Sequence, residues 1–200
     1  MSSAHAATVS DYAPASTATG IPNGKLGMWV FLASEVMFFT GLISAYVVLR
    51  MSHPHWPGSE GHLSVPIGTM NTLILICSST TIVLALAASS RNAIRAVQGW
   101  LLATMGLGSL FLVVKGFEYA AKFLHHIGPS TNIFWSCYFT LTAFHGLHVL
   151  GGILFNFWVL CYTVKPKSWS IHRQRLELAG LYWHFVDIVW IFLFPLLYLL

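Results

Sequence analysis

Six ionisable side chains lie inside long apolar runs of this sequence, where an isolated charge is costly. They are two glutamates, three histidines and one aspartate, namely Glu35, Glu118, His145, His148, His184 and Asp187. An ionised carboxylate in hydrocarbon costs at least ~2.5–3.5 kcal/mol, so residues of this kind are candidates for a functional site. Their side chains can bind a metal ion, exchange protons or join helices by hydrogen bonds.

The spacing of four of these residues gives only weak support to a metal site. His145 and His148 are three residues apart, as are His184 and Asp187, so each pair shares one face of a helix. A carboxylate-bridged metal centre in a helical bundle uses Glu-x-x-His motifs on paired helices. The sequence contains no such motif, and we therefore predict no metal site.

Hydrogen bonding between helices and proton exchange are the remaining roles. Polar side chains in membrane bundles usually bond across helices, and we expect carboxylates or backbone groups to satisfy His148 and His184. A carboxylic acid that burial keeps neutral can exchange a proton with a partner, and Glu35 is the candidate for this role. Lys115 precedes Glu118 by three residues, so it can pair with Glu118 or extend to the membrane surface.

The composition is that of an integral membrane protein. Of 200 residues, 56% are hydrophobic and only 8% are charged, with a mean hydropathy of +0.70; soluble domains carry about 25% charged residues. A membrane-spanning helix needs ~20 apolar residues, and five runs reach that length. We predict an all-α bundle of five transmembrane helices, at about residues 25–50, 66–90, 96–123, 131–164 and 176–199.

The segments outside these helices predict a tail and an orientation. Residues 1–22 are rich in Ala, Ser, Thr and Pro and lack the pattern of a signal peptide, so we expect a disordered tail before a transmembrane domain over residues 23–200. The positive-inside rule puts the N-terminus in the cytoplasm and the C-terminus in the periplasm. On the N-terminal side are Lys25, Arg91, Arg95, Lys165, Lys167, Arg173 and Arg175, against Arg50 and Lys122 on the other. The basic residues thus indicate orientation rather than nucleic-acid binding.

Five motifs in this order resemble subunit III of the haem-copper terminal oxidases. They are residues 29–39 (WVFLASEVMFF), 71–72 (NT), 118–119 (EY), 144–149 (FHGLHV) and 183–190 (WHFVDIVW). The resemblance covers residues 24–200 and is to the five-helix bacterial form, which lacks the first two of the family's seven helices. In seven-helix members, a cleft beside those two helices holds phospholipid.

The resemblance implies a multi-pass subunit in the bacterial inner membrane that has no catalytic residue and holds no haem or copper. Those cofactors are then expected in partner subunits. The implied partners are subunit I as the main contact, subunit II and other oxidase subunits, a larger respiratory supercomplex and membrane lipids. The implied role is to support proton uptake and durable turnover. The family's two glutamates fall on Glu35 and Glu118, and its polar residues on the last two helices fall on His145, His148, His184 and Asp187.

Other functions stay open at this point. An accessory membrane protein of a nitric oxide reductase system shares the five-helix pattern. A standalone proton-coupled transporter could use Glu35 and Asp187 as a relay, although the chain lacks the internal repeat and paired broken helices typical of transporters. A membrane metalloenzyme is a third alternative. The absence of a Cys-x-x-Cys-His haem-attachment pattern from the sequence agrees with the role of a non-catalytic oxidase subunit. The electron donor of an oxidase, cytochrome c or quinol, is also open.

Overall fold

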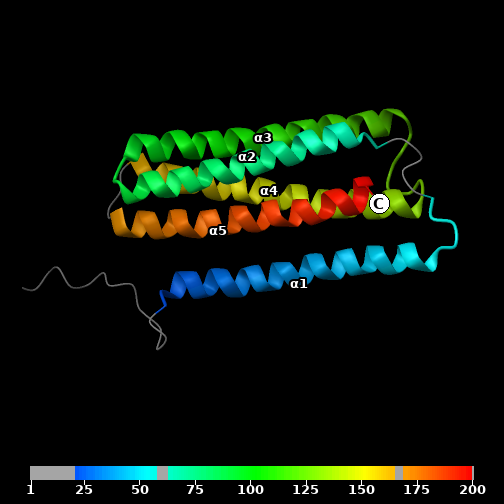
Figure 1. Ribbon diagram of the computed structural model, residues 1–200, viewed down its shortest axis with the longest axis horizontal. Helices are drawn as coiled ribbons and strands as arrows, with labels where there is room; N and C mark the ends of the chain where they lie inside the picture. Colours follow the sequence, from blue (N-terminus) through cyan, green and yellow to red (C-terminus); the bar gives the residue numbers. More distant parts are fainter. Residues whose placement is uncertain (1–20, 58–62, 165–168, 200) are drawn as a thin grey trace, which may run out of the picture.

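A computed structural model describes residues 21–57, 63–164 and 169–199, without the side chains of residues 164–171. In this part of the chain, five long helices lie side by side along one axis, without β-strands (Figure 1). They are α1 (Asn23–Ser52), α2 (Val65–Ser90), α3 (Ile94–Leu124), α4 (Ile133–Val164) and α5 (Trp169–Phe194), which continues into the π-helical turn η1 (Pro195–Leu199). Each of the five is long and apolar enough to cross a membrane. The predicted all-α bundle of five helices is confirmed, whereas residues 1–20 of the expected tail lie outside the described residues.

The fifth helix begins at Trp169, earlier than the predicted start near residue 176. The sequence suggested a basic loop up to Arg175, but Arg175 and the nearby Glu177 both have partners on other helices. The Arg175 guanidinium lies 4.8 Å from the ring centre of Trp158, and Glu177 pairs with Lys25 of α1 at 2.8 Å. These contacts favour the helical conformation over a solvated loop.

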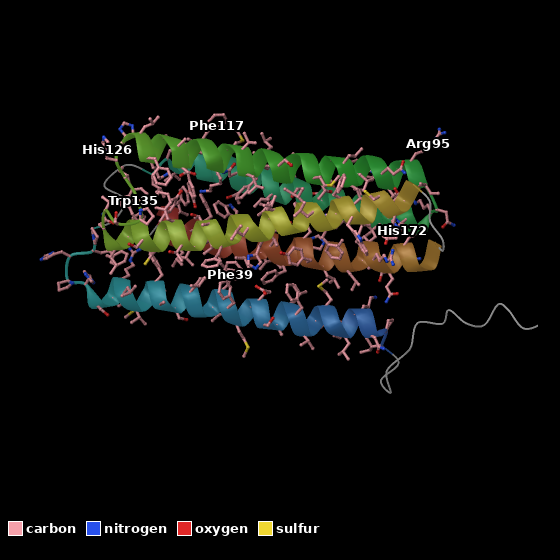
Figure 2. The ribbon with its side chains drawn as sticks, turned by 180° about the vertical axis from the view of Figure 1, so that it is seen from behind. Phe39, Arg95, Phe117, His126, Trp135 and His172 are labelled. Atoms are coloured by element: carbon pink, nitrogen blue, oxygen red, sulfur yellow. The ribbon has the colours of Figure 1, made fainter. Side chains whose placement is uncertain are left out.

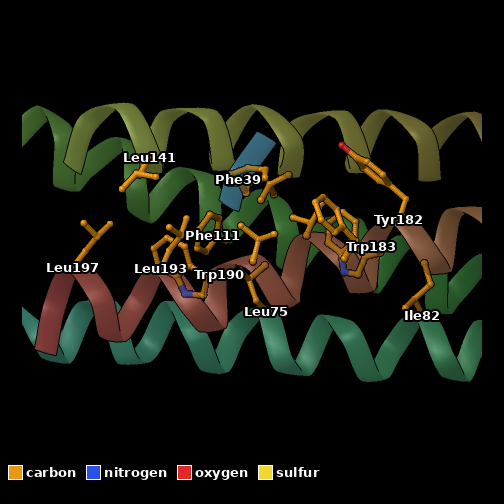
Figure 3. Close-up of a cluster of buried hydrophobic side chains, with 14 of the residues drawn as sticks. Phe39, Leu75, Ile82, Phe111, Leu141, Tyr182, Trp183, Trp190, Leu193 and Leu197 are labelled. Atoms are coloured by element: carbon orange, nitrogen blue, oxygen red, sulfur yellow. The ribbon is translucent and has the colours of Figure 1, made fainter. Parts of the chain in front are cut away.

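Helix α5 lies at the centre of the bundle, and its large aromatic side chains set how closely α3 and α4 approach. Trp183 is fully buried, and Figure 3 shows it in the apolar core among side chains of several helices. A Cβ atom on Gly108 would lie 2.6 Å from the Trp183 ring, and one on Gly152 would lie 2.8 Å from it. Both glycines therefore make room for the indole, whose Nε1 donates to Ser78 Oγ at 3.0 Å.

Helix α1 lies at the edge of the bundle, separated from α2 by α5 (Figure 1). Its described surface is mostly exposed, and its two fully buried residues are Phe39 and Tyr46. Figure 2 shows Phe39 between α1 and the rest of the bundle. Polar contacts hold the helix at three levels: Lys25 with Glu177 at one end, Glu35 near the middle, and Tyr46, whose hydroxyl donates to the Leu196 carbonyl at 3.3 Å.

Candidate functional site

The first of the predicted residues, Glu35, meets His148 across the contact between α1 and α4. Glu35 Oε2 lies 2.9 Å from His148 Nε2, and both side chains are largely buried, with exposed fractions of 20% and 17%. The other imidazole nitrogen, Nδ1, lies 2.7 Å from the Phe144 carbonyl oxygen one turn earlier in α4. The Phe39 ring packs edge-on against the imidazole, at 5.0 Å between ring centres. A carboxylate and a backbone group thus satisfy His148, as the sequence suggested.

The partners of His148 indicate which of its ring nitrogens donates a hydrogen bond. A carbonyl oxygen only accepts hydrogen bonds, so His148 Nδ1 carries a hydrogen. The contact between Nε2 and Glu35 then needs one more proton, either on a neutral carboxylic acid or on an imidazolium. Both forms have zero total charge, which suits an apolar environment. A hydrogen bond between the two side chains therefore needs one proton in addition to the hydrogen on Nδ1.

Glu118 is the centre of a second buried cluster, formed by α3, α4 and η1. Its carboxylate accepts from Lys115 Nζ at 2.9 Å and from Lys122 Nζ at 2.8 Å. The hydroxyls of Tyr138 and Tyr198 also donate to it, each at 2.9 Å, and Lys115 donates to the Tyr198 oxygen as well. All three charged residues are less than 10% exposed, so Lys115 pairs with Glu118 rather than extending to the surface.

Aromatic rings surround the two lysines of this cluster. Lys115 Nζ lies 4.8 Å from the Trp190 ring centre, and Lys122 Nζ lies 4.9 Å from that of Tyr138 and 5.6 Å from that of Trp135. Figure 2 shows Trp135 at the end of the bundle that also carries His126. Two ammonium groups and one carboxylate give a formal charge of +1, which the faces of these rings stabilise.

His145 occupies a different environment from His148, although both lie on the same face of α4. Its side chain is fully buried, stacked on Trp190 at 5.0 Å and edge-on to Phe111 at 5.6 Å between ring centres. Neither imidazole nitrogen has a hydrogen-bond partner among the described residues. His145 therefore belongs to the aromatic core, and the shared helix face does not make the two histidines one site.

His184 and Asp187 face α2. Ser79 Oγ lies 2.7 Å from His184 Nδ1, so a hydroxyl takes the place of the carboxylate or backbone partner that we expected for this histidine. Asp187 is 5% exposed. Its carboxylate oxygens make no hydrogen bond of good geometry within the described part of the chain, although Ser79 approaches it.

The candidate residues thus divide into separate groups rather than forming one centre. Within the described ranges, no three His, Cys, Asp or Glu side chains are grouped so that they could hold a metal ion. Four residues of these groups were not expected there from the sequence: Lys122, Tyr138, Tyr198 and Ser79. Lys122 follows Glu118 by four residues, a spacing that signals contact on a helix; the other three come from distant segments and leave no local signal.

Comparisons with known proteins agree with the resemblance read from the motifs. A family model described as cytochrome c oxidase subunit III matches residues 6–200. Cytochrome c oxidase subunit 3 of Thermostichus vulcanus is 41% identical over 178 residues, which cover 88% of this chain and 86% of the relative. The corresponding protein of Corynebacterium diphtheriae is 36% identical, covering 87% of this chain and 86% of its own length.

A further relative points the same way. Cytochrome c oxidase subunit 3 of Alkalihalophilus pseudofirmus is 33% identical over 89% of this chain and 87% of its own length. These comparisons favour neither an accessory protein of nitric oxide reductase nor a transporter. The chain belongs to the cytochrome c oxidase subunit III family.

Proposed function

We propose that this chain is a non-catalytic subunit whose Glu35–His148 pair holds one exchangeable proton for its oxidase. Its family makes it a component of a terminal oxidase complex, and its five helices and bacterial relatives make it a multi-pass protein of the bacterial inner membrane. The hydrogen bond between Glu35 and His148 is the observation that carries the proposal. The names of the relatives favour cytochrome c as the electron donor of the complex.

The other subunits hold the haem and copper in this proposal. Its support is that both glutamates of the buried sites already have partners within this chain, Glu118 with two lysines and Glu35 with His148. Subunit I is the main partner, with subunit II, other oxidase subunits and a larger respiratory supercomplex beyond it.

Helix α1 is the surface that we assign to subunit I. It is the least buried helix of the bundle and presents apolar side chains on most sides. Such a helix faces either lipid or another protein. Contact with subunit I along α1 would bring Glu35, which retains 20% exposure in this chain alone, close to a partner that can give or take its proton.

Loss of the shared proton would change the contact between α1 and α4. Without that proton, the lone pair of His148 Nε2 faces an ionised Glu35, and the hydrogen bond is lost because neither atom is a donor. The carboxylate then turns toward a donor or a cation, and the returning proton restores the bond. Proton exchange is in this way coupled to a contact between two helices.

The orientation of the chain is also a proposal. The start of α1 and the α2–α3 turn lie at one end of the bundle, and the end of η1 lies at the other (Figure 1). The basic residues of the sequence are concentrated at the former end, which we place in the cytoplasm.

Replacing Glu35 by Gln in the whole complex tests the proton role. Glutamine keeps the shape and can still bond to His148, but it cannot gain or lose a proton. We expect normal assembly, judged by the amount of haem recovered per copy of this chain, with slower proton uptake or a changed number of turnovers before inactivation. Wild-type uptake kinetics and lifetime in a fully assembled Glu35→Gln complex would exclude the role.

A further inference from the structure

A partly open pocket of about 630 Å³ lies between the start of α2 and the end of α3. Its volume falls in the range of small-molecule binding sites, roughly 300–1,000 Å³. Glu118 and Lys122 of the buried cluster form part of its wall, and their exposed fractions are only 8% and 4%. The pocket is formed by α2, α3 and the turn that follows α3, whereas Glu35 lies in α1, so the pocket is separate from the proposed proton site.

The polarity of the pocket changes along the helix axes. Its α3 lining recurs every three or four residues from Val114 through Phe117 to His125, and its α2 lining runs from Ser64 to Met70. Of the apolar lining residues, Met70, Val114 and Phe117 lie farthest from the helix ends. The polar residues Lys122, His125 and Ser64 lie in the last turn of α3 or next to the helix ends, where Pro66 and Ile127 also contribute apolar surface. Since the helices cross the membrane, the apolar part lies at the depth of acyl chains and the polar part at the depth of lipid headgroups.

The charge at the polar end favours an anion. Lys115, Lys122 and Glu118 together carry a formal charge of +1, and the described lining contains one carboxylate, Glu118, which both lysines already neutralise in part. The first turn of α2 adds a partial positive charge. Ser64, the residue before this helix, makes no side-chain cap to the first-turn N–H groups.

We propose that this pocket binds an anionic phospholipid, with an acyl chain between α2 and α3 and the phosphate near Lys122, His125 and the first turn of α2. The lipid comes from the leaflet at the Leu124 end of the bundle. Its negative charge offsets the net charge of the buried cluster, which is otherwise uncompensated within the described residues of this chain.

Two charge variants of the assembled complex test the sign of this interaction. The complex is purified in a mixture of phosphatidylglycerol and phosphatidylcholine, and the lipids that remain bound are counted by mass spectrometry. Lys122→Gln changes the formal charge of the cluster to zero, and Glu118→Gln changes it to +2. We expect the first to lower and the second to raise selectivity for phosphatidylglycerol, each by about fivefold, which corresponds to ~1 kcal/mol for one charge.

The two variants control for each other, because each removes one partner of the same ion pair. General loosening of the fold would change the phosphatidylglycerol selectivity of both variants in the same direction. Such a result would overturn the proposal.

A second pair of variants tests the place of binding. Ala121→Trp fills the pocket that Ala121 lines, whereas the neighbouring exposed Ala120 lies outside the lining, so Ala120→Trp is the matched control. We expect only Ala121→Trp to abolish selective retention of phosphatidylglycerol. Equal retention of phosphatidylglycerol by the two tryptophan variants would place the lipid elsewhere and overturn the assignment. This test does not depend on whether the charge variants assemble.

Discussion

At the scale of single residues, burial alone does not distinguish groups that matter for stability from those that do not. Glu35 and His148 satisfy each other across two helices, and Glu118 accepts from two lysines and two tyrosines. Asp187 is buried as well, with 5% exposure, but it makes no hydrogen bond of good geometry among the described residues. Removing one partner of a satisfied pair leaves a costly orphan, whereas removing a group without a partner leaves none.

This difference predicts opposite outcomes for two substitutions with the same new residue. His148→Leu leaves Glu35 without its partner and should destabilise the chain by about 1–3 kcal/mol. Asp187→Leu removes a buried carboxyl group whose polar neighbour, Ser79, makes no hydrogen bond of good geometry with it, so this substitution should be neutral or stabilising. The measurement is the temperature at which each purified complex loses this subunit. Equal losses of stability would show that Asp187 has a partner of comparable importance.

At the scale of the helices, close contacts depend on small residues opposite large ones. Trp183 of α5 packs on Gly108 of α3 and on Gly152 of α4. Gly106 lies one half-turn away from Gly108 on the same helix, and a Cβ there would meet nothing within 4 Å. The two α3 glycines therefore differ in packing while sharing the same backbone conformation.

Gly108→Ala should destabilise the bundle, because its Cβ would lie 2.6 Å from the Trp183 ring and overpacking costs about 1–3 kcal/mol. Gly106→Ala is the control and should gain up to ~1 kcal/mol, because alanine favours the helix. Thermal unfolding of the two variants in the same detergent gives the comparison. A Gly108→Ala chain as stable as Gly106→Ala would mean that α3 and α5 can separate without cost.

At the scale of the whole molecule, the bundle has two chemically different ends. The end that includes the α2–α3 turn receives most of the basic residues, and the end that includes the α3–α4 turn holds the Glu118 cluster and the lipid pocket. In the proposed orientation, the basic end is cytoplasmic and the pocket opens toward the periplasmic leaflet.

Two exposed serines at opposite ends test this orientation. Ser90 ends α2 and Ser130 lies between α3 and α4. A membrane-impermeant maleimide added to spheroplasts should label Ser130→Cys and leave Ser90→Cys unlabelled until the membrane is opened. The unmodified chain controls for its own cysteines. Labelling of Ser90→Cys alone would reverse the orientation and move the lipid pocket to the cytoplasmic leaflet.

The sequence by itself determined the five helices, because the length of an apolar run that crosses a membrane is a local property. It also predicted a pair between Lys115 and Glu118 as one of two outcomes for this lysine, since residues three apart share a helix face. Only the tertiary structure decided which helix each face meets. Glu35 and His148 are 113 residues apart in sequence, and Tyr138 and Tyr198 reach Glu118 from two other elements.

The different partners of His145 and His148 show why the sequence alone could not assign the contacts of the polar groups. Periodicity places both on one side of α4, but the rotation of α4 against its neighbours directs His145 to Trp190 and His148 to Glu35. That rotation follows from packing, with Trp183 fitted against Gly108 and Gly152. Contacts between segments far apart in sequence leave no local pattern, so the partners of the polar groups were decided by the fold.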